Sequence, residues 1–275
     1  MTGLSISRAW EESKASIAVD GKLMLIVAAA LVALPEIIGS VIVPQSTQTE
    51  GTLASTLVLL ITSILTLIGQ LAIIRLAVAP AVSVGEAIAH GARRMPIYLV
   101  AGIMLTIAFV LALIPFALIL YGAGVPLDPA NELATVASPV TMVLALVYLA
   151  LLIFVCVRML MASPVASEEE VGPIQILRRS WDLTSGHWWR LFAFLVIFFI
   201  GAAIAIAAVN WVISFVAVML FGPIEPMSAS ALVVALVDAC VNATVTVLLA
   251  VMLARIYLQL AGRESADVGV PISGT

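Results

Sequence analysis

Charged residues are scarce in this 275-residue sequence: they make up only 10% of it, while hydrophobic residues make up 63%. An ordinary soluble domain carries about 25% charged residues. A soluble fold of this length could not hide so much apolar surface from water. The composition therefore excludes a soluble globular protein and predicts an integral membrane protein.

Residue types that carry catalysis or bind metals are also few. The two histidines, His90 and His187, lie in different polar stretches and are not spaced as zinc ligands. The two cysteines, Cys156 and Cys240, fall inside apolar runs, which favours small packing residues over a disulfide or a metal cluster. No glycine-rich phosphate loop, nucleophile elbow or kinase signature occurs. We therefore expect no enzyme activity, no cofactor and no metal.

Six apolar runs are each long enough to cross the hydrocarbon core of a bilayer, which takes about 20 helical residues. Residues 1–22, which precede the first run, are polar and charged, unlike a cleavable signal peptide. The sequence predicts an all-α integral membrane protein with six transmembrane helices in a single domain, 1–275. The expected spans are 23–43, 53–79, 97–121, 139–162, 190–221 and 230–260.

Lysine and arginine are absent from the connections 44–52, 122–138 and 222–229. All twelve lie before the first run or near the connections on the other side. Because positive residues in short loops resist translocation, that side is predicted to be cytoplasmic, together with both termini. We expect a multi-pass protein of the bacterial cytoplasmic (inner) membrane. No basic stripe with interleaved aromatic residues indicates a nucleic-acid partner.

The second, fourth and sixth runs end alike, each with an arginine shortly before a helix breaker: Arg75, Arg158 and Arg255. A long side chain near the end of a span can extend to the headgroups, which is the structural interpretation. The functional interpretation is that the three guanidinium groups bind a lipid phosphate or another anion. Membrane lipids are then the expected partners.

The stretches that lead into the first, third and fifth runs also match, because each is short and has helical periodicity. Ser83 and Glu86 have the spacing of a capping box before the third run. We predict three repeated hairpins, each preceded by a cytoplasmic interfacial helix; the alternative is that the stretches are linkers. The predicted units are 1–80, 81–164 and 165–262, followed by a C-terminal tail at 263–275.

Asp238 and Asn242 are four residues apart and therefore share a face of the sixth run. A carboxyl group in hydrocarbon is costly unless it is paired or hydrated, so we expect it to face the bundle interior or a water-filled cavity. It could be a hydrogen-bonded aspartate that joins helices. It could instead form a proton- or cation-responsive site with Asn210 and Gln70. Glu36, near the end of the first run, is expected to be solvated.

The polar stretch between the fourth and fifth runs combines acidic and aromatic residues. The triplet Glu168–Glu170 is expected to be a solvated loop, or a favourable charge before a helix N-terminus. Pro173 suits a first helical position and Gly186 a helix end. Trp188 and Trp189 are typical of the aromatic belt at a membrane interface.

The same region holds a specific motif, Arg-Ser-Trp followed by Leu-Thr-x-Gly. It resembles the bacterial glycerophosphoryl diester phosphodiesterase membrane-domain family, whose six-span layout is similar over most of the chain. In members that hydrolyse glycerophosphodiesters, activity belongs to a separate soluble domain with a His-Arg-Gly motif, whereas His90 is followed by Gly-Ala. The resemblance implies a membrane module without a catalytic domain. The matching residues are Arg179, Ser180, Trp181, Leu183, Thr184 and Gly186.

Three functional hypotheses follow. The first is a non-enzymatic membrane protein that binds lipid headgroups or supports partners, either other membrane proteins or copies of itself. The second is a small transporter or channel whose pathway passes Asp238 and Asn242. The third, an intramembrane enzyme that acts on a lipid, is disfavoured because no acid, base and nucleophile come together in the sequence.

Overall fold

The computed structural model describes residues 5–42, 53–79, 82–123, 139–223 and 228–267. Most of these residues are helical, and none of them lies in a strand. Six helices in this part of the chain are long and apolar enough to cross a membrane, which confirms the predicted number of spans. The protein is therefore an all-α membrane protein.

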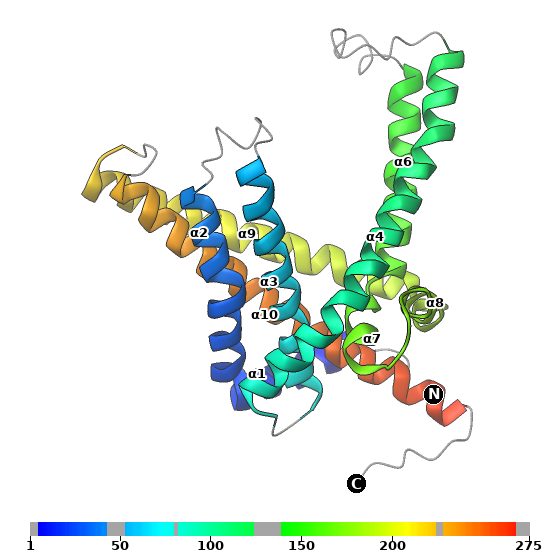
Figure 1. Cartoon of the computed structure of the whole chain (residues 1–275), viewed down its shortest axis with the longest axis horizontal. Helices are drawn as coiled ribbons and strands as arrows, with labels where there is room; N and C mark the ends of the chain where they lie inside the picture. Colours follow the sequence, from blue (N-terminus) through cyan, green and yellow to red (C-terminus); the bar gives the residue numbers. More distant parts are fainter. Residues whose placement is uncertain (1–4, 43–52, 80–81, 124–138, 224–227, 268–275) are drawn as a thin grey trace.

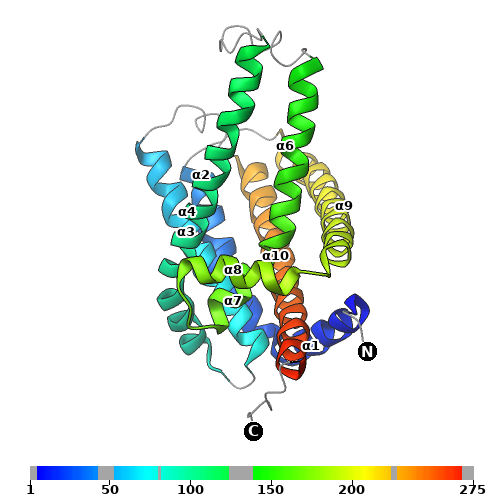
Figure 2. The ribbon, with the colours of Figure 1, turned by 90° about the vertical axis from the view of Figure 1, so that its right-hand side faces the viewer.

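The first span is one continuous helical path made of three segments: α1 (Ile6–Ala28), the π-helical turn η1 (Ala29–Ala33) and α2 (Leu34–Ile42). Ser5 begins it, because its hydroxyl accepts a hydrogen bond from the N–H of Arg8 at 3.3 Å. Figure 2 shows that the part of α1 nearest the N-terminus lies crosswise at the base of the molecule. The second span, α3 (Leu53–Val78), packs beside this path.

The third and fourth spans are α4 (Val84–Gly122) and α6 (Pro139–Arg158). The capping box that the sequence predicts at the start of α4 is confirmed: the Ser83 hydroxyl accepts from the N–H of Glu86, and the Glu86 carboxylate accepts from the N–H of Ser83. Helix α6 ends at Arg158, within an apolar candidate span that extends from Pro139 to Glu168 and includes the predicted span end at 162. Pro164 lies in the first turn of the short helix α7 (Ala162–Glu168), where proline is tolerated, and does not end a helix.

The remaining helices are α8 (Pro173–Thr184), α9 (Trp188–Phe221) and α10 (Ala229–Asp267). Figure 1 shows α2 beside α3, α4 beside α6, and α9 beside α10, and these pairs diverge from a shared base. We name this base, where α7 and α8 lie, the basic end. The opposite end, where α4 and α9 finish, is the hairpin end.

The interior lies mainly toward the basic end. One apolar cluster joins α7, α8 and α10 around Met161, Ile176 and Ile256, and the other joins α1, α3 and α10 around Met24 and Val251. Away from these clusters the spans are exposed. In the most apolar 18-residue stretch of α4, no residue is buried, and in those of α6 and α9 only 6% of the residues are buried. Because the chain is a membrane protein, these apolar side chains face acyl chains and not water.

Two glycines allow α3 to approach its neighbours closely. A Cβ atom on Gly91 of α4 would lie 2.7 Å from the carbonyl oxygen of Ile68, and one on Gly69 would lie 2.9 Å from the Cβ of Leu31. Small residues at such contacts let helix backbones pack tightly in a membrane, where apolar burial does not drive association. Helix α3 is therefore held between α4 and the first span.

The three predicted units differ in how the interfacial stretch joins its span. In the first two units the stretch runs into the span within one helix, α1 or α4. In the third unit α8 is separate, because Gly186 adopts φ 79° between α8 and α9. This backbone conformation favours glycine, which has no Cβ atom to clash. The repeated hairpin remains a prediction from the sequence.

Candidate functional site

Asp238 lies at the centre of a polar cluster inside the spans. The Nδ2 of Asn210, on α9, donates a hydrogen bond to Oδ1 of Asp238 at 2.8 Å. The Nδ2 of Asn242 donates to the other carboxylate oxygen, Oδ2, at 3.3 Å. The structure therefore brings these three predicted residues together. Gln70, the fourth, makes no hydrogen bond to them within the described part of the chain.

Glu36 of α2 completes this cluster, although the sequence suggested a solvated carboxyl group. The same Nδ2 of Asn242 donates to Oε1 of Glu36 at 3.3 Å, and the Glu36 side chain is partly buried. One amide group thus joins two carboxyl groups from α2 and α10. The position of Glu36 near the end of an apolar run did not reveal which way its side chain faces. We name Glu36, Asn210, Asp238 and Asn242 the intramembrane polar cluster.

The cluster also contains a buried amide oxygen that has no hydrogen-bond donor among the described residues. The Oδ1 of Asn210 is buried and accepts no hydrogen bond from any described residue. Buried acceptors are normally paired, so an unpaired one calls for an explanation. Here it belongs to the amide that contacts Asp238, so two carboxyl groups and a free amide oxygen lie in one small region. All three are ligand types for a hard cation, and all can accept from a proton donor.

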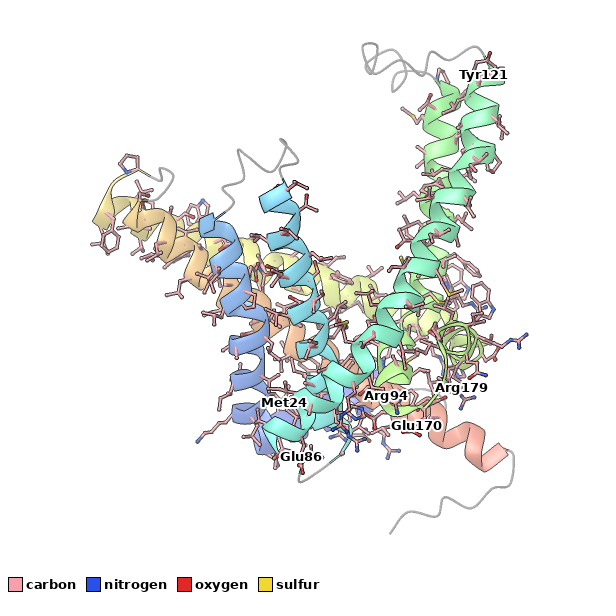
Figure 3. All side chains as sticks on the ribbon, in the orientation of Figure 1. Met24, Glu86, Arg94, Tyr121, Glu170 and Arg179 are labelled. Atoms are coloured by element: carbon pink, nitrogen blue, oxygen red, sulfur yellow. The ribbon has the colours of Figure 1, made fainter. Side chains whose placement is uncertain are left out.

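The acidic triplet Glu168–Glu170 forms ion pairs. We predicted a solvated loop or a favourable charge before a helix N-terminus: the triplet does precede α8, but only Glu170 is largely solvated. Each glutamate pairs with an arginine of a different helix, and Figure 3 shows Arg94 and Glu170 near each other at the basic end. The Glu168 and Glu169 side chains are 11% and 22% exposed, whereas that of Glu170 is 91% exposed. The pairs are Glu168 with Arg75 of α3 at 2.6 Å, Glu169 with Arg179 of α8 at 3.1 Å, and Glu170 with Arg94 of α4 at 3.0 Å.

Two more hydrogen bonds attach α10 and α4 to the same segment. The Tyr257 hydroxyl of α10 donates to Oε1 of Glu169 at 2.9 Å. The Nε2 of His90 lies 2.7 Å from the carbonyl oxygen of Ser167 and donates to it, because a carbonyl can only accept. We name the triplet with its three arginines, Tyr257 and His90 the basic-end network. It joins α3, α4, α8 and α10 to one another.

The Arg-Ser-Trp motif with its Leu-Thr-x-Gly ending, which lies in and just after α8, connects this helix to the end of α6. The hydroxyl group of Ser180 donates to the carbonyl oxygen of Arg158 at 2.8 Å. The Thr184 hydroxyl lies 3.3 Å from the same oxygen, although its nearest acceptor is the carbonyl oxygen of Ser180, at 2.9 Å. The hydrogen bond from Ser180 satisfies a carbonyl that the end of α6 leaves without an intrahelical partner. The Arg158 guanidinium lies over the ring of Trp181 at 4.9 Å and donates to the Trp181 carbonyl and the Ser185 hydroxyl. These motif residues therefore have a structural role.

The end of α8 completes the connection to α9. Leu183 is buried, and the turn at Gly186 separates the two helices. Helix α9 then begins with Trp188, which stacks on Phe192 at 5.1 Å between ring centroids. Trp189 is 75% exposed, as an aromatic residue at a membrane interface would be.

Arg255 differs from the other two repeat arginines. No described residue accepts a hydrogen bond from its guanidinium, whereas those of Arg75 and Arg158 have partners. Its Nε is buried and unpaired, as is the Nε of Arg158, and the same is true of Nε2 of Gln259, one turn later. The Oε1 of Gln259 accepts a weak hydrogen bond from the backbone N–H of Ser5 at 3.5 Å, which places this pair beside the start of α1. Arg75 and Arg158, in contrast, are engaged inside the protein. Among the described residues, no contact joins Arg75, Arg158 and Arg255 to a shared partner.

Residues of catalytic or metal-binding type are isolated elsewhere in the described ranges. No group of three or more histidine, cysteine, aspartate or glutamate residues in these ranges is placed to hold a metal ion. Cys156 and Cys240 are free, and their side chains are exposed and not packed in the interior as predicted. His187 contacts only the nearby carbonyl of Ser185, at 3.2 Å.

Comparison with curated proteins and with solved structures gives no match. A family model, described as "Domain of unknown function (DUF7847)", matches residues 4–260. The match includes both the intramembrane polar cluster and the basic-end network. The relation to the phosphodiesterase membrane domains rests on the motif alone and remains a prediction. The chain belongs to the DUF7847 family, a family of unknown function.

Proposed function

We propose that the protein is a small transporter or channel that is controlled by a proton or cation bound at the intramembrane polar cluster. The observation that carries this proposal is the pair of carboxyl groups, Glu36 and Asp238, that share the amide of Asn242. A purely structural aspartate would need one partner, and Asn210 already provides it at 2.8 Å. A second carboxyl group, that of Glu36, on the amide of Asn242 is better explained by a bound positive charge.

The charges of this cluster do not balance. If both carboxyl groups are ionised, the hydrogen bonds that reach them come from neutral amides. Negative charge inside a membrane is costly unless a partner or water compensates it. One proton shared between the carboxyl groups, or one cation coordinated by them and by Oδ1 of Asn210, would reduce this cost. The occupied and empty states then differ in how strongly α2, α9 and α10 attract one another.

The first span also has a backbone feature suited to a conformational response. The π-helical turn η1 ends at Ala33, and Pro35, which has no backbone N–H, follows just before Glu36. Single π-helical turns interrupt the regular hydrogen-bond pattern and occur often at functional sites. A change of charge at Glu36 would act directly on this irregular segment.

The test measures flux in proteoliposomes that contain the purified protein, with proton and monovalent-cation gradients and a broad solute panel. We expect a flux that depends on pH or on the cation, and we expect Asp238→Asn and Glu36→Gln to abolish that dependence. Gln70→Leu is the control, because Gln70 lies in a neighbouring span but makes no hydrogen bond to the cluster. The proposal fails if the wild type shows no such flux, or if Asp238→Asn leaves the dependence unchanged.

A second candidate function, non-enzymatic binding of an anionic lipid headgroup, is favoured by the buried, unpaired donors of Arg255 and Gln259. A phosphate oxygen could accept from both. Arg255→Gln should then reduce the anionic lipid that co-purifies with the protein, as measured by native mass spectrometry. Arg93→Gln is the charge-matched control, because Arg93 is exposed. Equal lipid retention in the two variants would exclude this site. Neither candidate function requires a catalysed reaction.

A further inference from the structure

We propose that a cavity between α3, α4, α7 and α8 binds an acyl chain of a membrane lipid. The cavity has a volume of about 330 Å³. An apolar cavity of about 150 Å³ holds a benzene molecule, so there is room here for a considerably longer hydrocarbon segment. This site is separate from the intramembrane polar cluster, and the proposal does not depend on the transport function.

The walls of the cavity come from four helices and the turn after α6. Leu67 of α3 and Leu177 of α8 face α4 across it, and Met159 and Ala162 line it just beyond the end of α6. Helix α4 contributes the longest wall, from Tyr98 to Thr106. The lining is mainly apolar, with Tyr98 and Thr106 as its polar side chains, so the cavity suits a hydrocarbon ligand.

The polar groups of the lining are already satisfied within the protein. The Thr106 hydroxyl donates to the carbonyl oxygen of Gly102 at 3.0 Å, and the Tyr98 hydroxyl is hydrogen-bonded to Ser163. A buried water molecule needs two to four polar partners, which this lining does not offer. Water is therefore a poor occupant, and an apolar one is favoured.

The opening of the cavity lies on the part of α4 that faces lipid. Gly102 and Thr106 are exposed, and Ile103 is 49% exposed. The most apolar window of α4 has no buried residue at all, so this face borders the hydrocarbon of the bilayer. An acyl chain can enter from there without crossing a polar layer.

Gly102 supplies a direct way to close the cavity. A Cβ atom added at Gly102 would meet no atom within 4 Å, so a larger side chain fits without displacing the backbone. Gly102→Phe would place a ring at the opening. Ile107→Phe is the matched control, because Ile107 lies on the exposed face of the same helix, is 53% exposed and does not line the cavity.

The experiment uses the full chain in liposomes that contain a phospholipid with a photoreactive group in its acyl chain. Labelled peptides are identified by mass spectrometry. We expect labelling to be enriched in the peptides that carry Leu67, Met159 and Leu177, to be lost in Gly102→Phe, and to persist in Ile107→Phe. Uniform labelling over the exposed faces, or persistence of the enriched labelling in Gly102→Phe, would overturn the proposal. If Gly102→Phe does not fold, Gly102→Leu provides the same test.

Discussion

The basic-end network and the intramembrane polar cluster both join several helices through charged side chains, but only the first is balanced in charge. Each glutamate of the basic-end network has its own arginine, at 2.6 to 3.1 Å. In the cluster, the hydrogen-bond partners of Glu36 and Asp238 among the described residues are neutral amides. Neutralising one carboxylate should destabilise the fold where each carboxylate has its own arginine. It can stabilise the fold where two carboxylates lie together without a positive partner.

This difference separates the structural role of the basic-end network from the responsive role that we propose for the cluster. Partly buried ion pairs at the basic end hold α3, α4 and α8 around the segment that ends α7. For the cluster we propose that a bound proton or cation compensates the two carboxyl groups, so that its state would depend on the surroundings of the protein. Three substitutions that each neutralise one carboxylate test this comparison.

The largest effect is expected for Glu168→Gln, which leaves the Arg75 guanidinium without its carboxylate. Removing one partner of a buried pair costs about 3–5 kcal/mol, but Arg75 is 32% exposed and water screens part of the loss. We expect the free energy of unfolding in detergent to fall by about 2 kcal/mol. Chemical unfolding followed by circular dichroism measures it.

The control for Glu168→Gln is Glu12→Gln. Glu12 pairs with Arg8 on the surface of α1 at 2.7 Å, and the two side chains are 33% and 69% exposed. Such a surface pair contributes about 0.3–0.5 kcal/mol, so its loss should be small. Equal effects of the two substitutions would show that the basic-end network does not support the fold.

Asp238→Asn should have a smaller effect of the opposite sign. It removes one of two negative charges that share an amide, and asparagine keeps the shape and one acceptor oxygen. We expect the free energy of unfolding at neutral pH to stay constant or to rise by about 1 kcal/mol. Unfolding of wild type and variant in parallel over a pH series measures it. A fall comparable to that of Glu168→Gln would mean that the cluster is structural after all.

The spans were predictable because hydropathy is a local property of the sequence. A run of about 20 apolar residues has few structural options other than a transmembrane helix. The division of this stretch into α6 and α7 was not predictable, because Pro164 can either end a helix or stand in the first turn of the next. The structure has the second arrangement, with α7 beginning at Ala162.

The polar contacts were harder to predict, because they depend on distant parts of the chain. Arg75 and Glu168 are 93 residues apart, and Asn242 and Glu36 are 206 residues apart. The spacing of Asp238 and Asn242 indicated a shared helix face, since both lie within one helix. Nothing local showed that Glu36 turns toward that face, or that the acidic triplet meets three arginines.

The smallest effect is expected for Glu170→Gln. This substitution tests whether solvent exposure alone decides how much each ion pair of the basic-end network contributes to stability. Glu170 pairs with Arg94 at 3.0 Å, but its side chain is 91% exposed, against 11% for Glu168. Water and salt screen an exposed pair, so the free energy of unfolding should fall by no more than about 0.5 kcal/mol. High salt should remove even this difference, while most of the loss in Glu168→Gln should remain. A loss as large as that of Glu168→Gln would instead show that the three pairs act as one unit, in which the outer pair positions the inner ones.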